Sequence, residues 1–161
     1  MVNARRSFSS NRTSLIAIAL ILMFAIATLF LTHPQTTSLN LSPVAGLISL
    51  KAMAADAIPY DIAVANAKPT LIEFYADWCT TCQSLAPTLQ SLHEEFGSQV
   101  NFVMLDIDDP KWSQQIQQFH ATGVPQLTLL KADQTVSDTF VGKVPKPLLI
   151  QCLQTLISQV S

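Results

Sequence analysis

The stretch that most constrains the fold lies between residues 70 and 96, where a β-rich run leads directly into two cysteines and a helical pattern. The run TLIEFYA follows Pro69 and is rich in residues that favour strands. From Thr81 onward, leucines recur at helical spacing. A second buried-looking strand follows at Asn101–Asp106. A strand, a helix and a further strand predict a parallel, right-handed crossover, with the cysteines at the end of the first strand.

The remainder of residues 58–161 continues this alternation. Short helical patterns precede the first strand and follow the second, two strands then form a hairpin around a polar turn, and a last helix ends the domain. The expected ranges are Tyr60–Ala67, Lys111–Ala121, Gln126–Lys131, Val136–Val141 and Pro147–Val160. The chain therefore predicts an α/β domain, a mixed sheet flanked by helices.

An uncharged apolar run from Leu15 to Leu31 precedes that domain. It is near the shortest length that crosses a membrane as a helix, so we predict a transmembrane anchor at 15–32. A cleaved signal peptide is the alternative, but the first small-residue cleavage site, Ala52-Met53-Ala54, lies far beyond the run. Residues 33–57 are expected to be a linker, within which Val44–Leu50 could rest on the membrane, add a strand or have no role.

Charge gives the expected orientation. Three arginines precede the apolar run, which places residues 1–14 in the cytoplasm and the domain across the membrane, in a periplasm or thylakoid lumen. Residues 56–161 contain five basic and eleven acidic side chains, a net charge of −6. Phosphate groups repel such a domain, so we do not expect it to bind nucleic acid.

The cysteine pair is placed for redox chemistry. The attacking species in thiol–disulfide exchange is the thiolate, and a helix N-terminus stabilises an anion. We therefore expect Cys79 to be the exposed nucleophile and Cys82, one turn later, to be the buried thiol that resolves a mixed disulfide. Trp78 would flank the pair as a rigid apolar surface.

Other uses of the cysteines are less well supported. Structural zinc normally needs two closely spaced ligand pairs, and His93 and His120 are too far apart to form the second pair, so no metal is expected. A purely structural disulfide remains an alternative, although so small a loop constrains the unfolded chain little. We expect Cys152, in the last helix, to pack as a small hydrophobic residue.

The motifs TLIEFYADWCTTCQSLAP, VMLDIDDP, GVPQLTLL and FVGKV together resemble the thioredoxin family. In particular, the chain is similar to membrane-anchored thioredoxin-like proteins of thylakoids, the TxlA type. The resemblance implies a thioredoxin-like fold and a redox-active Cys79–Cys82 disulfide with no other cofactor. It also implies that Trp78, Val124, Pro125 and Gly142 contact the substrate, with a cis bond before Pro125. Pro87 matches a proline that kinks the active-site helix.

Two features depart from the family pattern, the buried carboxyl with its neighbouring residue and the pair of residues between the cysteines. Glu73 replaces a buried aspartate beneath the second cysteine, and Met104 replaces a nearby lysine. Apolar surroundings should raise the pKa of the Glu73 carboxyl and let it exchange a proton with Cys82; the alternative is that Glu73 points outward. Thr80 and Thr81 stand where Gly-Pro is usual, and their extra donors should make the disulfide more oxidising.

The resulting hypothesis is an anchored thiol–disulfide oxidoreductase that reduces protein disulfides through Cys79 and Cys82. The resemblance suggests apocytochrome c as substrate and a membrane thiol transporter of the CcdA/DsbD type as electron donor. Two alternatives stay open: an oxidase or isomerase of exported proteins, and a non-catalytic module that binds a client at Val124-Pro125.

Overall fold

The computed structural model describes residues 43–160 together with residues 16, 18 and 21–23. The predicted cytoplasmic segment 1–14, most of the predicted anchor 15–32 and the first part of the linker, 33–42, lie outside the described residues. Within the described part of the chain, no helix has the length and apolar character needed to cross a membrane.

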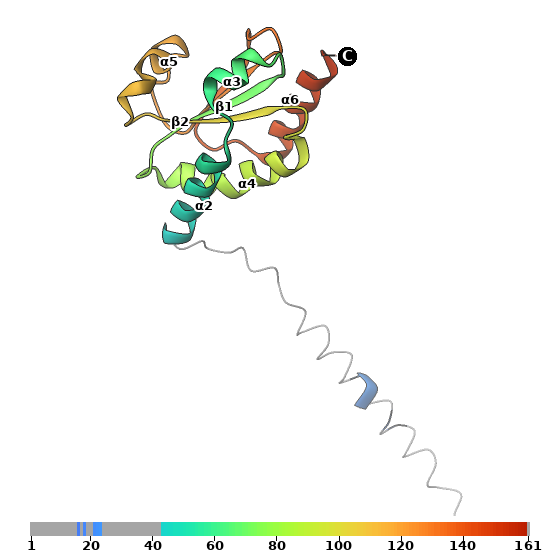
Figure 1. The fold of residues 1–161 in the computed structure, drawn as a ribbon. Helices are drawn as coiled ribbons and strands as arrows, with labels where there is room; N and C mark the ends of the chain where they lie inside the picture. Colours follow the sequence, from blue (N-terminus) through green and yellow to red (C-terminus); the bar gives the residue numbers. More distant parts are fainter. Residues whose placement is uncertain (1–15, 17, 19–20, 24–42, 161) are drawn as a thin grey trace, which may run out of the picture. The chain divides into compact units, whose positions relative to one another are not determined.

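A four-stranded mixed sheet with the order β2-β1-β3-β4 organises the domain (Figure 1). Its strands are β1 (Thr70–Tyr75), β2 (Asn101–Asp106), β3 (Gln126–Leu130) and β4 (Val136–Val141). β1 pairs with β2 in parallel, whereas β3 is antiparallel to both β1 and β4. The predicted parallel crossover and the following hairpin are therefore confirmed.

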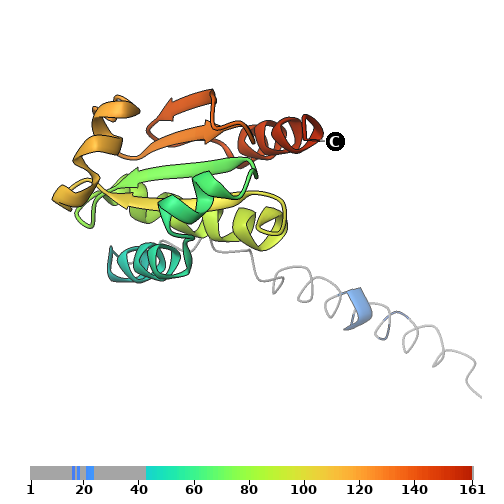
Figure 2. The same ribbon diagram turned by 45° about the horizontal axis from the view of Figure 1, so that its top comes forward.

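Helices cover both faces of the sheet (Figure 2). On one face, α4 (Thr80–Phe96) and α6 (Lys146–Ser158) bury their leucines against Leu71, Phe102 and Leu127. On the other face, α3 (Tyr60–Ala65) and α5 (Ser113–Gln118) pack on Ile72, Phe74 and Val103. Successive strand residues point to opposite faces, so β1, β2 and β3 each supply both cores.

The helix expected at Lys111–Ala121 is shorter and divided. A 3₁₀ turn, η1 (Pro110–Trp112), precedes α5. The Asp109 side chain accepts a hydrogen bond from the Lys111 backbone N–H (3.1 Å), which satisfies one of the free donors at the start of this turn.

Part of the segment predicted as a linker is a helix of the domain. α2 (Pro43–Asp56) packs along α4, with Leu50 completely buried and Met53 2 % exposed. Val44–Leu50 is therefore neither an added strand nor a segment without structure. Its apolar residues gain burial against the cysteine-bearing helix, which explains why a stretch without distinct polar and apolar faces is helical.

Candidate functional site

The two cysteines lie where β1 passes into α4. Cys79 is the N-cap of α4, and its Sγ accepts a hydrogen bond from the Cys82 backbone N–H at 3.1 Å. Cys79 and Cys82 form a disulfide. Cys79 is 5 % exposed and Cys82 is fully buried. The predicted nucleophile is thus the accessible member of the pair, but the expectation of an exposed residue was wrong, because neighbouring side chains cover most of it.

This position favours a thiolate on Cys79 when the disulfide is reduced. The first N–H groups of a helix lack intrahelical partners and carry a partial positive charge. The Cys82 N–H already points at the Cys79 sulfur. A thiolate at this atom would therefore gain a hydrogen bond and a favourable dipole, both of which lower a thiol pKa.

Glu73 is buried on the same face of β1 as the cysteine helix. Alternation along the strand places it with Leu71 and Tyr75, which pack toward α4 and α2. Its neighbours in register are Met104 on β2 and Leu127 on β3. The side chain is 0 % exposed, so the alternative that Glu73 points outward is wrong.

Among the residues that the structure describes, the Glu73 carboxyl has neither a hydrogen-bond partner nor a neighbouring cation. Both of its oxygens are buried without a partner. Burial raises the pKa of this carboxyl from 4.5 to about 8, because the charged form loses its hydration. Such a group can hold or release a proton near neutral pH, which suits proton exchange with a nearby thiol. Its exchange with Cys82 stays a prediction.

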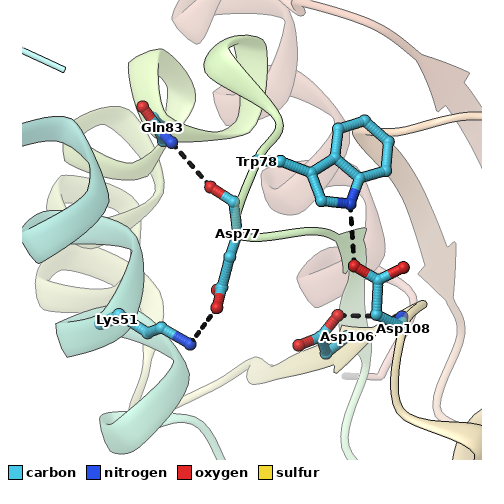
Figure 3. A network of polar contacts seen from close by, with 6 residues as sticks. All are labelled: Lys51, Asp77, Trp78, Gln83, Asp106 and Asp108. Carbon is cyan, nitrogen blue, oxygen red and sulfur yellow. Dashed lines mark hydrogen bonds and ion pairs between the residues drawn. The ribbon is translucent and has the colours of Figure 1, made fainter.

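Trp78 forms the exposed rim of the site. Its side chain is 64 % exposed, and its indole N–H donates to an Asp108 carboxylate oxygen at 2.8 Å. The Asp108 backbone N–H in turn donates to Asp106 at 3.0 Å, so the loop after β2 fixes the indole ring (Figure 3). Trp78 thus presents a fixed apolar surface beside Cys79.

Asp77, next to Trp78, is held from two helices (Figure 3). The Gln83 side-chain amide on α4 donates to the Asp77 backbone carbonyl at 2.7 Å. Lys51 on α2 forms an ion pair with the Asp77 carboxylate at 2.5 Å. Sequence reasoning missed these contacts and that of Asp108, because it placed Lys51 in a linker and assigned no role to either aspartate.

The Val124-Pro125 loop lies against the cysteine cluster. Its peptide bond is cis, as the resemblance implied, and Val124 packs on the group that contains Cys79 and Cys82. The Gly142 N–H donates to the Pro125 carbonyl at 2.8 Å. Gly142 has φ +87°, a conformation that glycine adopts without strain, so the turn can place its N–H there. The structure therefore brings Gly142, which follows β4, next to the Val124-Pro125 loop, while the contact of these residues with substrate stays a prediction.

Cys152 is separate from this site. It is a free, partly exposed cysteine on α6, at the edge of the core that α4 and α6 form with the sheet. Burial and the nearby Asp138 raise the pKa of its thiol, which disfavours the reactive thiolate. In residues 43–160 and the few earlier positions described, no three His, Cys, Asp or Glu side chains gather as a metal site would require.

The family model described as Thioredoxin matches residues 51–155. The chain belongs to the thioredoxin family. The match begins inside α2 and includes the cysteine pair, the Val124-Pro125 loop and the hairpin.

Solved thioredoxin structures show the same fold. The oxidised mitochondrial thioredoxin 3 of Saccharomyces cerevisiae is 24 % identical, with a TM-score of 0.50 over 57 % of this chain and 82 % of that one. The Fasciola hepatica thioredoxin is 23 % identical, with a TM-score of 0.52 over 59 % of this chain and 88 % of that one.

Curated relatives within the family are more similar in sequence. The chloroplastic thioredoxin-like protein HCF164 of Arabidopsis thaliana is 39 % identical over 68 % of this chain and 42 % of its own length. The thiol:disulfide interchange protein TxlA of Synechococcus elongatus is 37 % identical over 68 % of this chain and 57 % of its length. The resemblance to the TxlA type is therefore confirmed. The matched part of the chain covers about half the length of these relatives.

Proposed function

We propose that the protein is a membrane-anchored thiol–disulfide oxidoreductase that reduces protein disulfides on the lumenal or periplasmic side of its membrane. The observation that carries the proposal is the Cys79–Cys82 disulfide at the N-terminus of α4. Relatives named as thiol:disulfide interchange proteins support this chemistry. The apolar run at 15–32 and the arginines before it support the anchor and its orientation.

The proposed reaction starts from the reduced pair. The Cys79 thiolate attacks one sulfur of a substrate disulfide, forms a mixed disulfide and releases one substrate thiolate. Cys82 then loses its proton, which we assign to the buried Glu73 carboxylate, and its thiolate attacks the Cys79 sulfur. The Cys79–Cys82 disulfide forms and the second substrate thiolate leaves. Two electrons thus pass from the protein dithiol to the substrate.

A donor of two electrons must then reduce the Cys79–Cys82 disulfide. Cytoplasmic reductases do not reach a domain across the membrane, so we propose a membrane thiol transporter of the CcdA/DsbD type. We further propose apocytochrome c as a substrate, because haem attachment requires free thiols. Trp78, the Val124-Pro125 loop that packs on the cysteine cluster, and Gly142, which is hydrogen-bonded to Pro125, would contact the substrate.

Reduction of insulin disulfides by the full chain in mild detergent, with dithiothreitol as the electron source, tests the activity. We expect Cys79→Ser to abolish it and Cys152→Ser to retain it. Cys82→Ser should accumulate mixed disulfides, whose partners identify substrate and donor together. A reduction potential near −120 mV, the value of a strong oxidant, would contradict a reductase and favour an oxidase. Full client binding by Cys79→Ser together with no insulin reduction by the parent chain would instead indicate a binding module.

A further inference from the structure

Helix α2 reaches the cysteine site directly, although most of it precedes the part of the chain that matches the family model. Leu50 is completely buried in the same cluster as Cys79, Cys82 and Ala86. The side chain that follows it, Lys51, pairs with Asp77, two residues before Cys79. One turn of α2 therefore contributes both an apolar contact and a charge to the site.

Gly46 allows α2 to approach the first turns of α4 closely. A Cβ atom at this position would lie 3.0 Å from the Gln83 Cβ and 3.4 Å from the Gln83 carbonyl oxygen. Gln83 is the residue whose amide holds the Asp77 carbonyl. The two helices thus fix Asp77 jointly: α4 holds the Asp77 backbone carbonyl through Gln83, and α2 holds the Asp77 carboxylate through Lys51.

The Lys51–Asp77 ion pair balances one charge in a largely acidic environment. One Asp77 oxygen faces Lys51, and the other is buried without a hydrogen-bond partner. Glu73 lies on β1, Asp106 is the last residue of β2, and Asp108 lies on the loop that follows and binds the Trp78 indole. The first turn of α4 has no acidic residue, and Lys143 follows Gly142 on the remaining loop. If Lys51 were absent, the Asp77 carboxylate would be an unpaired negative charge two residues before Cys79, on which the thiolate forms.

We propose that Lys51 is a positioning residue for thiol–disulfide exchange: through its ion pair with Asp77 it fixes the Asp77–Trp78–Cys79 loop and favours the Cys79 thiolate. The proposal makes α2 a component of the active site, and it rests on the exchange chemistry proposed above. Both partners are partly exposed, at 54 % for Lys51 and 43 % for Asp77, so the effect will be modest.

The test measures the reactivity of Cys79 itself. The rate of iodoacetamide alkylation is followed against pH for the reduced full chain in detergent, in a Cys152→Ser background that removes the free thiol. We expect Lys51→Met to raise the Cys79 pKa and to slow alkylation at pH 7 about twofold, the effect of one charge at the surface of a protein. Lys51→Arg should restore the parent rate. Lys68→Met is the matched control. The Lys68 Nζ donates to the Ser98 carbonyl oxygen, at the end of β1 opposite to the cysteines.

A double-mutant cycle with Asp77→Asn separates positioning from a direct effect of the Lys51 charge. If Lys51 acts through Asp77, Lys51→Met should change the alkylation rate only when Asp77 is present. Equal effects in both backgrounds, or no effect in either, would overturn the proposal. Alkylation does not need a protein substrate, so a chain that fails to reduce insulin would refute the proposed function and still allow the role of Lys51 to be judged.

Discussion

Replacing the buried Glu73 carboxyl with the neutral amide of Gln is predicted to stabilise the protein, by an amount that increases with pH. The pKa of Glu73 is about 8 in the folded protein against 4.5 for an ordinary glutamate. As pH rises through 4.5, the unfolded chain loses this proton while the folded chain keeps it. The contribution of Glu73 to stability is therefore greatest below pH 4.5, and it falls until the folded carboxyl also ionises near pH 8.

The slope sets the expected size of this effect. Each pH unit between these two pKa values costs about 1.4 kcal/mol of unfolding free energy. The unfolding free energy of Glu73→Gln should therefore be higher than that of the parent, by less than about 1 kcal/mol at pH 5 and by about 3 kcal/mol at pH 7. The residue is 0 % exposed, so solvent screening does not reduce this difference.

Urea unfolding of the oxidised full chain in mild detergent, followed by tryptophan fluorescence at pH 5 and pH 7, measures both values. Glu94→Gln on α4 is the control, because it removes an exposed carboxylate and should change stability little at either pH. Two results would refute the assignment of a high pKa to Glu73. One is a difference in unfolding free energy between parent and Glu73→Gln that is equal at the two pH values. The other is a parent that is more stable than Glu73→Gln at pH 7.

Two further substitutions examine the surroundings of this site. Met104→Lys places a cation beside Glu73 in the strand register, so it should lower the Glu73 pKa. The unfolding free energy should then fall less steeply between pH 5 and pH 8. Met104→Leu is the control and should keep the slope of the parent. Leu50→Ala should reduce the unfolding free energy by about 2–5 kcal/mol, whereas Ile48→Ala, at a position 63 % exposed on the same helix, should cost little. Equal losses for the two α2 variants would argue against packing of this helix on the domain.

The strands and the placement of the cysteines could be predicted from sequence because their signals are local. β1 shows a β-rich run after a proline, and its alternation places Glu73 on the face that α4 covers. The two partners of Glu73 in register, Met104 and Leu127, are apolar, so the direction of its pKa followed from residue type alone.

The role of α2 could not be predicted in this way. Its sequence, PVAGLISLKAMAAD, shows no distinct polar and apolar faces. What makes it a helix of the domain is tertiary: Gly46 fits against Gln83, and Leu50 enters a cluster formed by residues at least 25 positions further along the chain. The low exposure of Cys79 has the same origin, since the side chains that cover it come from other elements.

The order of the elements gives α2 a mechanical consequence. It is the first helix of the compact unit, so tension on the chain ahead of Pro43 acts on α2 before it reaches the sheet. Helix α2 is held by side-chain packing and one partly exposed ion pair, whereas β1 is hydrogen-bonded to strands on both sides. A pulling force would therefore detach α2 first and remove Leu50 from Cys82 while the sheet stayed intact. We therefore expect tension on the chain ahead of Pro43 to change the surroundings of the dithiol before it disrupts the sheet.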